Sequence, residues 1–162
     1  MFVAIRPPRA IRETLIDVMG GIEGARWQDD DQLHLTLAFA GEVDGARADD
    51  LIEALVDVES AVFPAEVAGI GHFERKGVPT AVWAGVPLSD PLAQLQRRVE
   101  RACRRAGLAL ERRAYRPHIT LARLRRTAAP VGDWLAKHGT LRAGPWQVEG
   151  FTLFESQLRP EG

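Results

Sequence analysis

Two strand-like segments of this chain begin with the same pattern, His-x-Thr-Leu, and they lie about half a chain apart. The first reads "HLTLAF" from His34 and the second reads "HITLAR" from His118. Because side chains alternate across a strand, each histidine should share one face with the threonine and alanine that follow it, and the apolar residues between them should take the other. This polar face comprises His34, Thr36 and Ala38 in one copy and His118, Thr120 and Ala122 in the other. The repeat predicts two related halves, each contributing one motif strand.

The order of the other segments does not follow a regular alternation of strands and helices. Apolar periodicity predicts strands at residues 2–5, 33–39, 65–73, 80–86, 118–124 and 146–154, and helices at 11–19, 44–58, 90–106 and 131–138. Two strands follow one another directly between the second and third helices, flanking the turn-rich link "ERKGVP". This order favours an α+β fold over a doubly wound parallel sheet. With no linker in sight, we expect one domain over residues 1–162.

Positive and negative charges nearly balance over the whole chain, but the positive charges are concentrated in one segment. The formal net charge is −1, yet residues 97–126 hold eleven arginines against only two acids, Glu100 and Glu111. A neutral protein with one basic sector suits a small or locally held anion better than a long duplex. An ordinary solvated helix face is the alternative interpretation. The single cysteine, Cys103, excludes an internal disulfide, and its helical position predicts a core residue.

The sequence has no feature that suggests export or insertion into a membrane. No stretch approaches the roughly 20 apolar residues of a membrane span. The opening "MFVAIRPP" lacks the basic leader and apolar run of a secretory signal. We therefore expect a cytoplasmic monomer that does not interact with membranes.

The repeated polar face suggests chemistry at phosphorus. If the two halves pack with these faces together, two imidazoles and two hydroxyls line one cleft. One imidazole can act as a base while the other acts as an acid, and the hydroxyls can donate to phosphate oxygens. In-line displacement by water needs this set, and a strained cyclic phosphate is a natural substrate because its leaving oxygen is already held. A lone strand histidine is usually structural, but packing has no need to repeat one, so the repeat favours function.

Three further residues near the motifs are candidates for substrate contact. Arg123 could hold an anion, although strict alternation places it on the face of Ile119 and Leu121, so it would need a bulge to reach the cleft. Tyr115 and Phe39 could stack on a base. For Phe39, alternation favours core packing instead.

The segments "LHLTLAFAGEV" and "YRPHITLAR" resemble the paired motifs of the 2H phosphoesterase superfamily, and in particular its RNA 2′,3′-cyclic phosphodiesterase branch, the 2′-5′ RNA ligase-like family. The resemblance extends to "MFVAIRPP", "GHFERKGVPTAVWAGV" and "FTLFESQL", and so covers nearly the whole chain in order. It implies a bilobal fold in which two pseudo-symmetric lobes, with antiparallel-type sheets flanked by helices, enclose a central cleft. Family members usually continue past "FTLFESQL" into another strand that contains an aromatic residue. The sequence ends at Gly162, four residues after that block, and leaves open whether this edge strand is part of the protein.

The resemblance also implies roles for the motif residues. His34 would donate a proton to the leaving ribose 3′ oxygen, and His118 would accept one from the attacking water. Thr36 and Thr120 would bind the phosphate, and the product would be a 2′-phosphomonoester. The local sequence is too symmetric to assign the two proton roles by itself. We expect neither a cofactor nor a metal, since His72 and His138 have no ligand-like spacing with the motif pair.

The predicted activity is hydrolysis of an RNA or nucleotide that ends in a 2′,3′-cyclic phosphate, with reverse 2′-5′ ligation as a side activity. Two alternatives stay open. One is a phosphodiesterase acting on small nucleotides, such as a cyclic 1″,2″-phosphate or a 2′-5′ oligoadenylate. The other is a non-catalytic nucleotide- or RNA-binding module that uses the same cleft as a phosphate grip.

Overall fold

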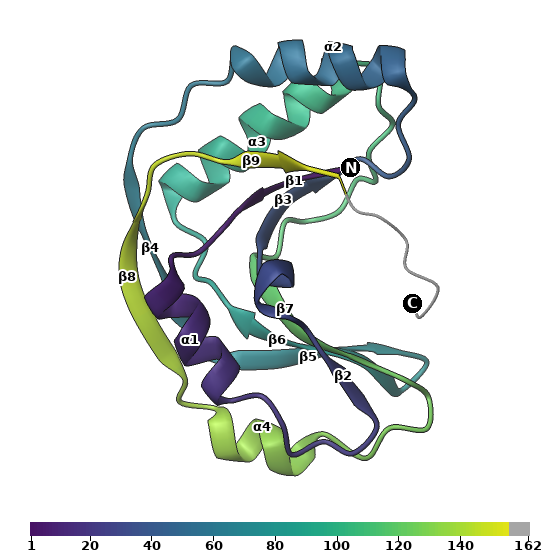
Figure 1. The fold of residues 1–162 in the computed structure, drawn as a ribbon, viewed down its shortest axis with the longest axis vertical. Coiled ribbons are helices and arrows are strands. Elements are labelled where there is room, and N and C mark those ends of the chain that lie inside the picture. Colours follow the sequence, from purple (N-terminus) through teal and green to yellow (C-terminus); the bar gives the residue numbers. More distant parts are fainter. Residues whose placement is uncertain (156–162) are drawn as a thin grey trace.

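A computed structural model describes residues 1–155 of the chain as an α+β fold (Figure 1). The elements are β1 (Phe2–Ile5), α1 (Arg9–Asp17), β2 (Ala25–Trp27), the 3-10 turn η1 (Asp30–Gln32), β3 (Leu35–Phe39), α2 (Gly45–Val56), β4 (Phe63–Ala68), β5 (Ile70–Arg75), β6 (Val78–Gly85), α3 (Asp90–Arg105), β7 (His118–Leu124), α4 (Gly132–His138), β8 (Arg142–Val148) and β9 (Thr152–Phe154). Within the described part of the chain, seven strands form one antiparallel sheet in the order β5-β6-β7-β3-β1-β9, with β2 also paired to β7. Strands β4 and β8 form a separate pair.

The molecule has two halves that each centre on one motif strand. Helices α2 and α3 lie beside the half formed by β9, β1 and β3, while α1 and α4 lie beside the half formed by β7, β6 and β5 (Figure 1). Each half thus takes segments from both ends of the sequence. This arrangement agrees with the two related lobes that the repeat predicts.

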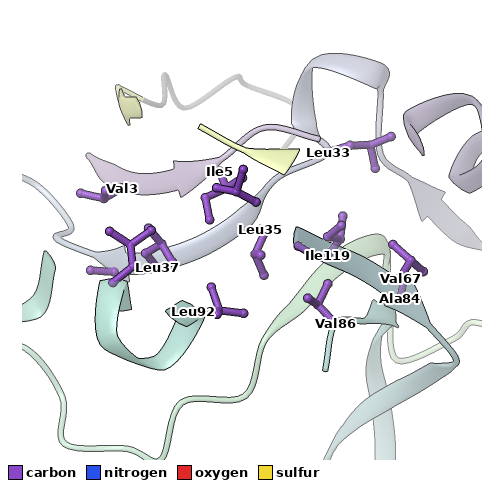
Figure 2. Close-up of a cluster of buried hydrophobic side chains, with 14 of the residues drawn as sticks. Val3, Ile5, Leu33, Leu35, Leu37, Val67, Ala84, Val86, Leu92 and Ile119 are labelled. Atoms are coloured by element: carbon purple, nitrogen blue, oxygen red, sulfur yellow. The ribbon is translucent and has the colours of Figure 1, made fainter. Parts of the chain in front are cut away.

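The two motif strands lie side by side in one sheet, which differs from the face-to-face packing that the sequence suggested. Strand β3 pairs with β7 antiparallel, with Leu35 opposite Ile119. Both of these side chains are fully buried in the hydrophobic core, to which Leu92 of α3 also belongs (Figure 2). The residues on either side of this pair therefore project from the other face of the sheet.

Local signals account for the boundaries of the long helices. The Asp44 carboxylate accepts a hydrogen bond from the backbone N–H of Arg47 at the start of α2, and the Ser89 hydroxyl does the same for Leu92 at the start of α3. The inner face of α3 is apolar and contains Cys103, which is fully buried as predicted. Burial raises the pKa of this thiol to about 11.

Three expected segments differ from the structure. The run at 65–73 breaks at Gly69, whose φ of +81° ends β4 in one sheet and lets β5 begin in the other. The run at 146–154 likewise divides into β8 and β9, in separate sheets. Residues 25–27, expected in a polar connection, form β2. The last three residues of "FTLFESQL", and the chain end beyond them, lie outside the described residues.

No helix within residues 1–155 is both long enough and apolar enough to cross a membrane.

Candidate active site

The pairing of β3 with β7 brings the two motif pairs together on one face of the sheet. Because Leu35 lies opposite Ile119, the antiparallel register places His34 across from Thr120 and Thr36 across from His118. The two histidines are then diagonal neighbours, a relation that separates residues across a strand pair by roughly 7–8 Å. Side chains at that spacing can reach one phosphorus atom lying between them.

A bulge in each motif strand changes which residues face the cleft. In β3 the register passes from Thr36 to Ala38 and leaves Leu37 without a partner in β1. In β7 it passes from Thr120 to Ala122 and leaves Leu121 without a partner in β6. The extra residue reverses the alternation after it.

The bulges overturn part of the sequence prediction and satisfy another part. Ala122, assigned to the open polar face, is fully buried, whereas Ala38 is nearly fully buried but still lines the cleft. Phe39, for which core packing was favoured, is 68% exposed and lines the cleft, so that expectation was wrong. Arg123 lines the same cleft, because β7 has the bulge that this position required.

The cleft has a volume of about 1100 Å³ and gathers most of the residues singled out from the sequence. Its walls include Thr36, Phe39, Tyr115, His118, Thr120 and Arg123. The Tyr115 hydroxyl donates a 2.8 Å hydrogen bond to the backbone carbonyl of Thr36. Tyr115 thereby fastens the segment before β7 against β3, whatever else it contacts.

His118 is held between a backbone carbonyl and two aromatic rings. Its Nδ1 lies 2.7 Å from the carbonyl oxygen of Arg116. Its ring meets Phe73 of β5 edge-on at 4.9 Å between centroids, and Trp83 of β6 lies 5.8 Å away. The Trp83 Nε1–H is itself buried and finds no acceptor among residues 1–155. These contacts fix the ring orientation and leave Nε2 as the nitrogen available for chemistry.

His34 has a similar arrangement but is more enclosed. It forms a hydrogen bond with the backbone carbonyl of Gln32, again two residues earlier in the chain. Its ring lies 4.4 Å from that of Phe154 in β9 and 5.4 Å from that of Phe2 in β1. Its Nε2 is inaccessible to solvent and has no partner among the described residues. Since Nε2 is unbonded, the bond to Gln32 is made by Nδ1.

Burial lowers the pKa of both motif histidines below the ordinary value of 6.5. For His34 the charge of Arg6 acts in the same direction, while the bond to the Gln32 carbonyl opposes the shift. For His118 the bond to the Arg116 carbonyl opposes it. Both rings are therefore neutral near pH 7 when no anion is bound.

The turn that leads into His34 is fixed by two arginines that the sequence analysis did not single out. The Asp30 carboxylate lies 2.9 Å from Nε of Arg12 and 3.1 Å from a terminal nitrogen of Arg6. Arg6 also donates to the backbone carbonyls of Asp30 and Asp31. The contact with Arg12 is the main cause of the lowered pKa of Asp30. Only the aspartate-rich run "DDD" before the motif hinted at such an anchor.

The site therefore combines one imidazole, two hydroxyls and one guanidinium on the cleft wall, with the second imidazole, that of His34, enclosed beside them. Within residues 1–155 no group of three or more His, Cys, Asp or Glu side chains is placed to hold a metal ion. The expectation of a metal-free reaction stays a prediction. An arrangement of two His-Thr pairs in a two-lobed antiparallel fold defines the class of two-histidine phosphoesterases.

Comparison with known families agrees with this class. The family model described as the 2′-5′ RNA ligase superfamily matches residues 7–159. The chain belongs to that superfamily, as its resemblance implied.

Curated relatives and solved structures extend the similarity over nearly the full length. An RNA 2′,3′-cyclic phosphodiesterase of Archaeoglobus fulgidus is 29% identical over the whole chain and 93% of its own length. One from Thermotoga maritima is 34% identical, over 86% of this chain and 74% of the relative. The crystal structure of TT0787 of Thermus thermophilus superposes with a TM-score of 0.80 at 26% identity, covering 99% of this chain and 90% of that one. E. coli LigT complexed with 3′-AMP gives a TM-score of 0.73 at 26% identity, covering 98% and 91%.

Proposed function

We propose that this protein is an RNA 2′,3′-cyclic phosphodiesterase that opens the cyclic phosphate to a 2′-phosphomonoester. The observation that carries the proposal is the register of β3 against β7, in which His34 is across from Thr120 and Thr36 is across from His118. Thr36, His118 and Thr120 line the cleft, and His34 is enclosed beside them with its ring against Phe154. Relatives named for this activity align over nearly the whole chain, which supports the same substrate class. RNA, or a nucleotide with the same cyclic end, is then the partner.

In the proposed reaction His118 is the base. Its Nδ1 bonds to a carbonyl oxygen and so carries the ring proton, which leaves a bare Nε2 in the neutral ring. The lowered pKa of this histidine keeps the ring in that form near pH 7. Nε2 takes a proton from water as the water oxygen bonds to phosphorus.

His34 is the acid in the same scheme and must carry a second proton. Its burial disfavours the charged ring, but an anionic phosphodiester placed beside it favours that ring and raises its pKa. Nε2–H then donates to the 3′ oxygen as the bond from phosphorus to that oxygen breaks. The Thr36 and Thr120 hydroxyls hold the non-bridging oxygens, and Arg123 adds a positive charge beside them.

Because Nε2 of His34 is covered, this scheme needs a small movement at the site. The ring closest to His34 belongs to Phe154, in a strand of three residues. Strand β9 pairs only with β1 among the described strands, so it forms an edge of the sheet. We expect Phe154 to shift when substrate enters.

The test is turnover of a short RNA that ends in a 2′,3′-cyclic phosphate, with the position of the phosphate in the product determined by NMR. We expect His34→Ala and His118→Ala each to lower kcat by about 10²–10⁴ while substrate binding stays measurable. A matched control is His72→Ala, since His72 stands in the same sheet but pairs with Glu74 at 2.8 Å. It should keep full activity.

Other outcomes would reject the proposal. A 3′-phosphate product would reverse the assignment of the leaving oxygen. Binding without turnover by the unmodified protein would instead identify a phosphate-binding module. Loss of activity in EDTA would contradict metal-free chemistry.

A further inference from the structure

A second hollow, separate from the cleft, lies on the outer side of α3 where this helix packs beside α2. It has a volume of about 640 Å³. Its walls are residues 57–59, which follow α2, and four arginines of α3: Arg98, Arg101, Arg104 and Arg105. We call this hollow the arginine groove.

The arginine groove holds more positive charge than its neighbours neutralise. Only Arg104 of the four arginines forms an ion pair within residues 1–155, with Glu100 at 2.7 Å. Arg98 donates to the backbone carbonyl of Glu59, a neutral acceptor. Arg101 and Arg105 are exposed and have no carboxylate within 4.0 Å among the described residues. The carboxylates of Asp57 and Glu59, together with that of Glu100, offset three of the four charges and leave an excess of one.

The arginine groove adjoins the active-site cleft along the surface of α3. Glu100 and Gln96 form part of the cleft wall, and Arg104, the partner of Glu100, forms part of the groove wall. The Glu100–Arg104 ion pair thus joins the wall of one hollow to the wall of the other. With a rise of 1.5 Å per residue, the step from Glu100 to Arg104 is about 6 Å along the helix. Arg113 and Arg116 stand on the cleft side of this boundary.

We propose that the arginine groove binds the sugar–phosphate backbone of the nucleotides on the 5′ side of the cyclic phosphate. The substrate is then a single-stranded RNA end several nucleotides long, rather than a free nucleotide. This inference rests on the proposed function, since it assumes that the cyclic end occupies the cleft. Guanidinium groups suit phosphate because their fork of donors matches its oxygens. A hollow between two helices suits a flexible single strand, which can enter it.

The test compares Arg101→Gln/Arg105→Gln with the unmodified protein on two substrates at several salt concentrations. The substrates are cytidine 2′,3′-cyclic phosphate and a ten-nucleotide RNA with the same end. For the RNA, kcat/KM should fall roughly three- to thirtyfold at low salt. The slope of log kcat/KM against log salt should become shallower by about 1.4, which is 0.7 for each lost contact. For the mononucleotide, kcat/KM should not change.

The control is Lys137→Gln/Arg142→Gln, which removes two exposed charges from α4 and β8, away from the groove. It makes the same change in net charge and should leave both substrates and both slopes unaltered. An equal loss from the control variant would mean that overall charge, rather than the groove, attracts RNA.

Two results would overturn the inference. One is an unchanged RNA rate and slope in the groove variant, as expected for a solvated face or a site for another partner. The other is an equal fall in kcat/KM on both substrates, which would place the effect in the cleft or the fold.

If the unmodified protein turns over neither substrate, the proposed function fails. The groove is then tested alone by fluorescence anisotropy of a labelled ten-nucleotide RNA ending in a 2′-phosphate, with the same slope criterion.

Discussion

A single methyl group added at Gly71 tests whether the aromatic rings around His118 position it for catalysis. Gly71 in β5 lies opposite Trp83 in β6. A Cβ at this position would lie 2.5 Å from Cζ2 and 2.9 Å from Cζ3 of the indole. Ordinary contacts are 3.4–4 Å, so the indole ring must move by about 1 Å. It cannot do so freely, because Phe73 and His118 lie against it.

We expect Gly71→Ala to act on both stability and rate. Overpacking of this kind costs about 1–3 kcal/mol of unfolding free energy. A displacement of about 1 Å at a catalytic group can cost about 10²-fold in rate. Denaturation in urea measures the first effect, and kcat on a cyclic phosphate substrate measures the second. Near-UV circular dichroism would report the changed surroundings of Trp83.

The matched control is Gly45→Ala, which adds the same methyl group where nothing lies within 4 Å. It should leave kcat unchanged and slightly stabilise α2. The decisive result concerns Gly71→Ala itself. If the Trp83 signal changes and stability falls while kcat stays at the parent value, the indole does not position His118, and the reasoning is refuted.

Three further outcomes follow from the site. Phe154→Ala should uncover His34 and move its pKa up toward 6.5, as followed by NMR titration of the imidazole; an unchanged pKa would mean that other groups bury this ring. Tyr115→Phe removes the hydrogen bond to the Thr36 carbonyl and should cost about 0.5–1.5 kcal/mol in urea denaturation; no loss would show that the bond is exchanged for water. The free energy of unfolding should fall as pH drops below 6.5, because the unfolded chain then takes up protons at both motif histidines before the folded chain does; substituting both histidines should flatten this part of the profile.

The parts of the fold that could be predicted are those that local sequence determines. The long helices carry their own caps and apolar stripes, and α3 matches its expected bounds within one residue. The motif strand β7 matches at both ends. Strand β2 was missed because three residues are too few to show alternation, and it is a strand only by virtue of its pairing with β7.

The features of the site that could not be predicted from the sequence depend on the register between strands. Leu37 and Leu121 sit in unbroken apolar alternation, and nothing local marks either as the extra residue of a bulge. The same limit applies to the clamp of Arg6 and Arg12 on Asp30, which joins residues far apart in the chain. Pattern analysis identifies the residues of a site better than it identifies their neighbours.

The bulges in β3 and β7 explain how two motif strands of similar sequence can bind a substrate that is not symmetrical. Each bulge follows the motif threonine, so the residue two positions beyond the extra leucine turns to the cleft in both copies. In one copy that residue is Phe39, and in the other it is Arg123. The two ends of a nucleotide differ in a similar manner, because one is the apolar face of the base and the other is an anionic phosphate. We therefore expect Phe39 to lie by the base and Arg123 by the phosphate, so that exchanging the two residues would lower kcat/KM more than replacing either alone by alanine.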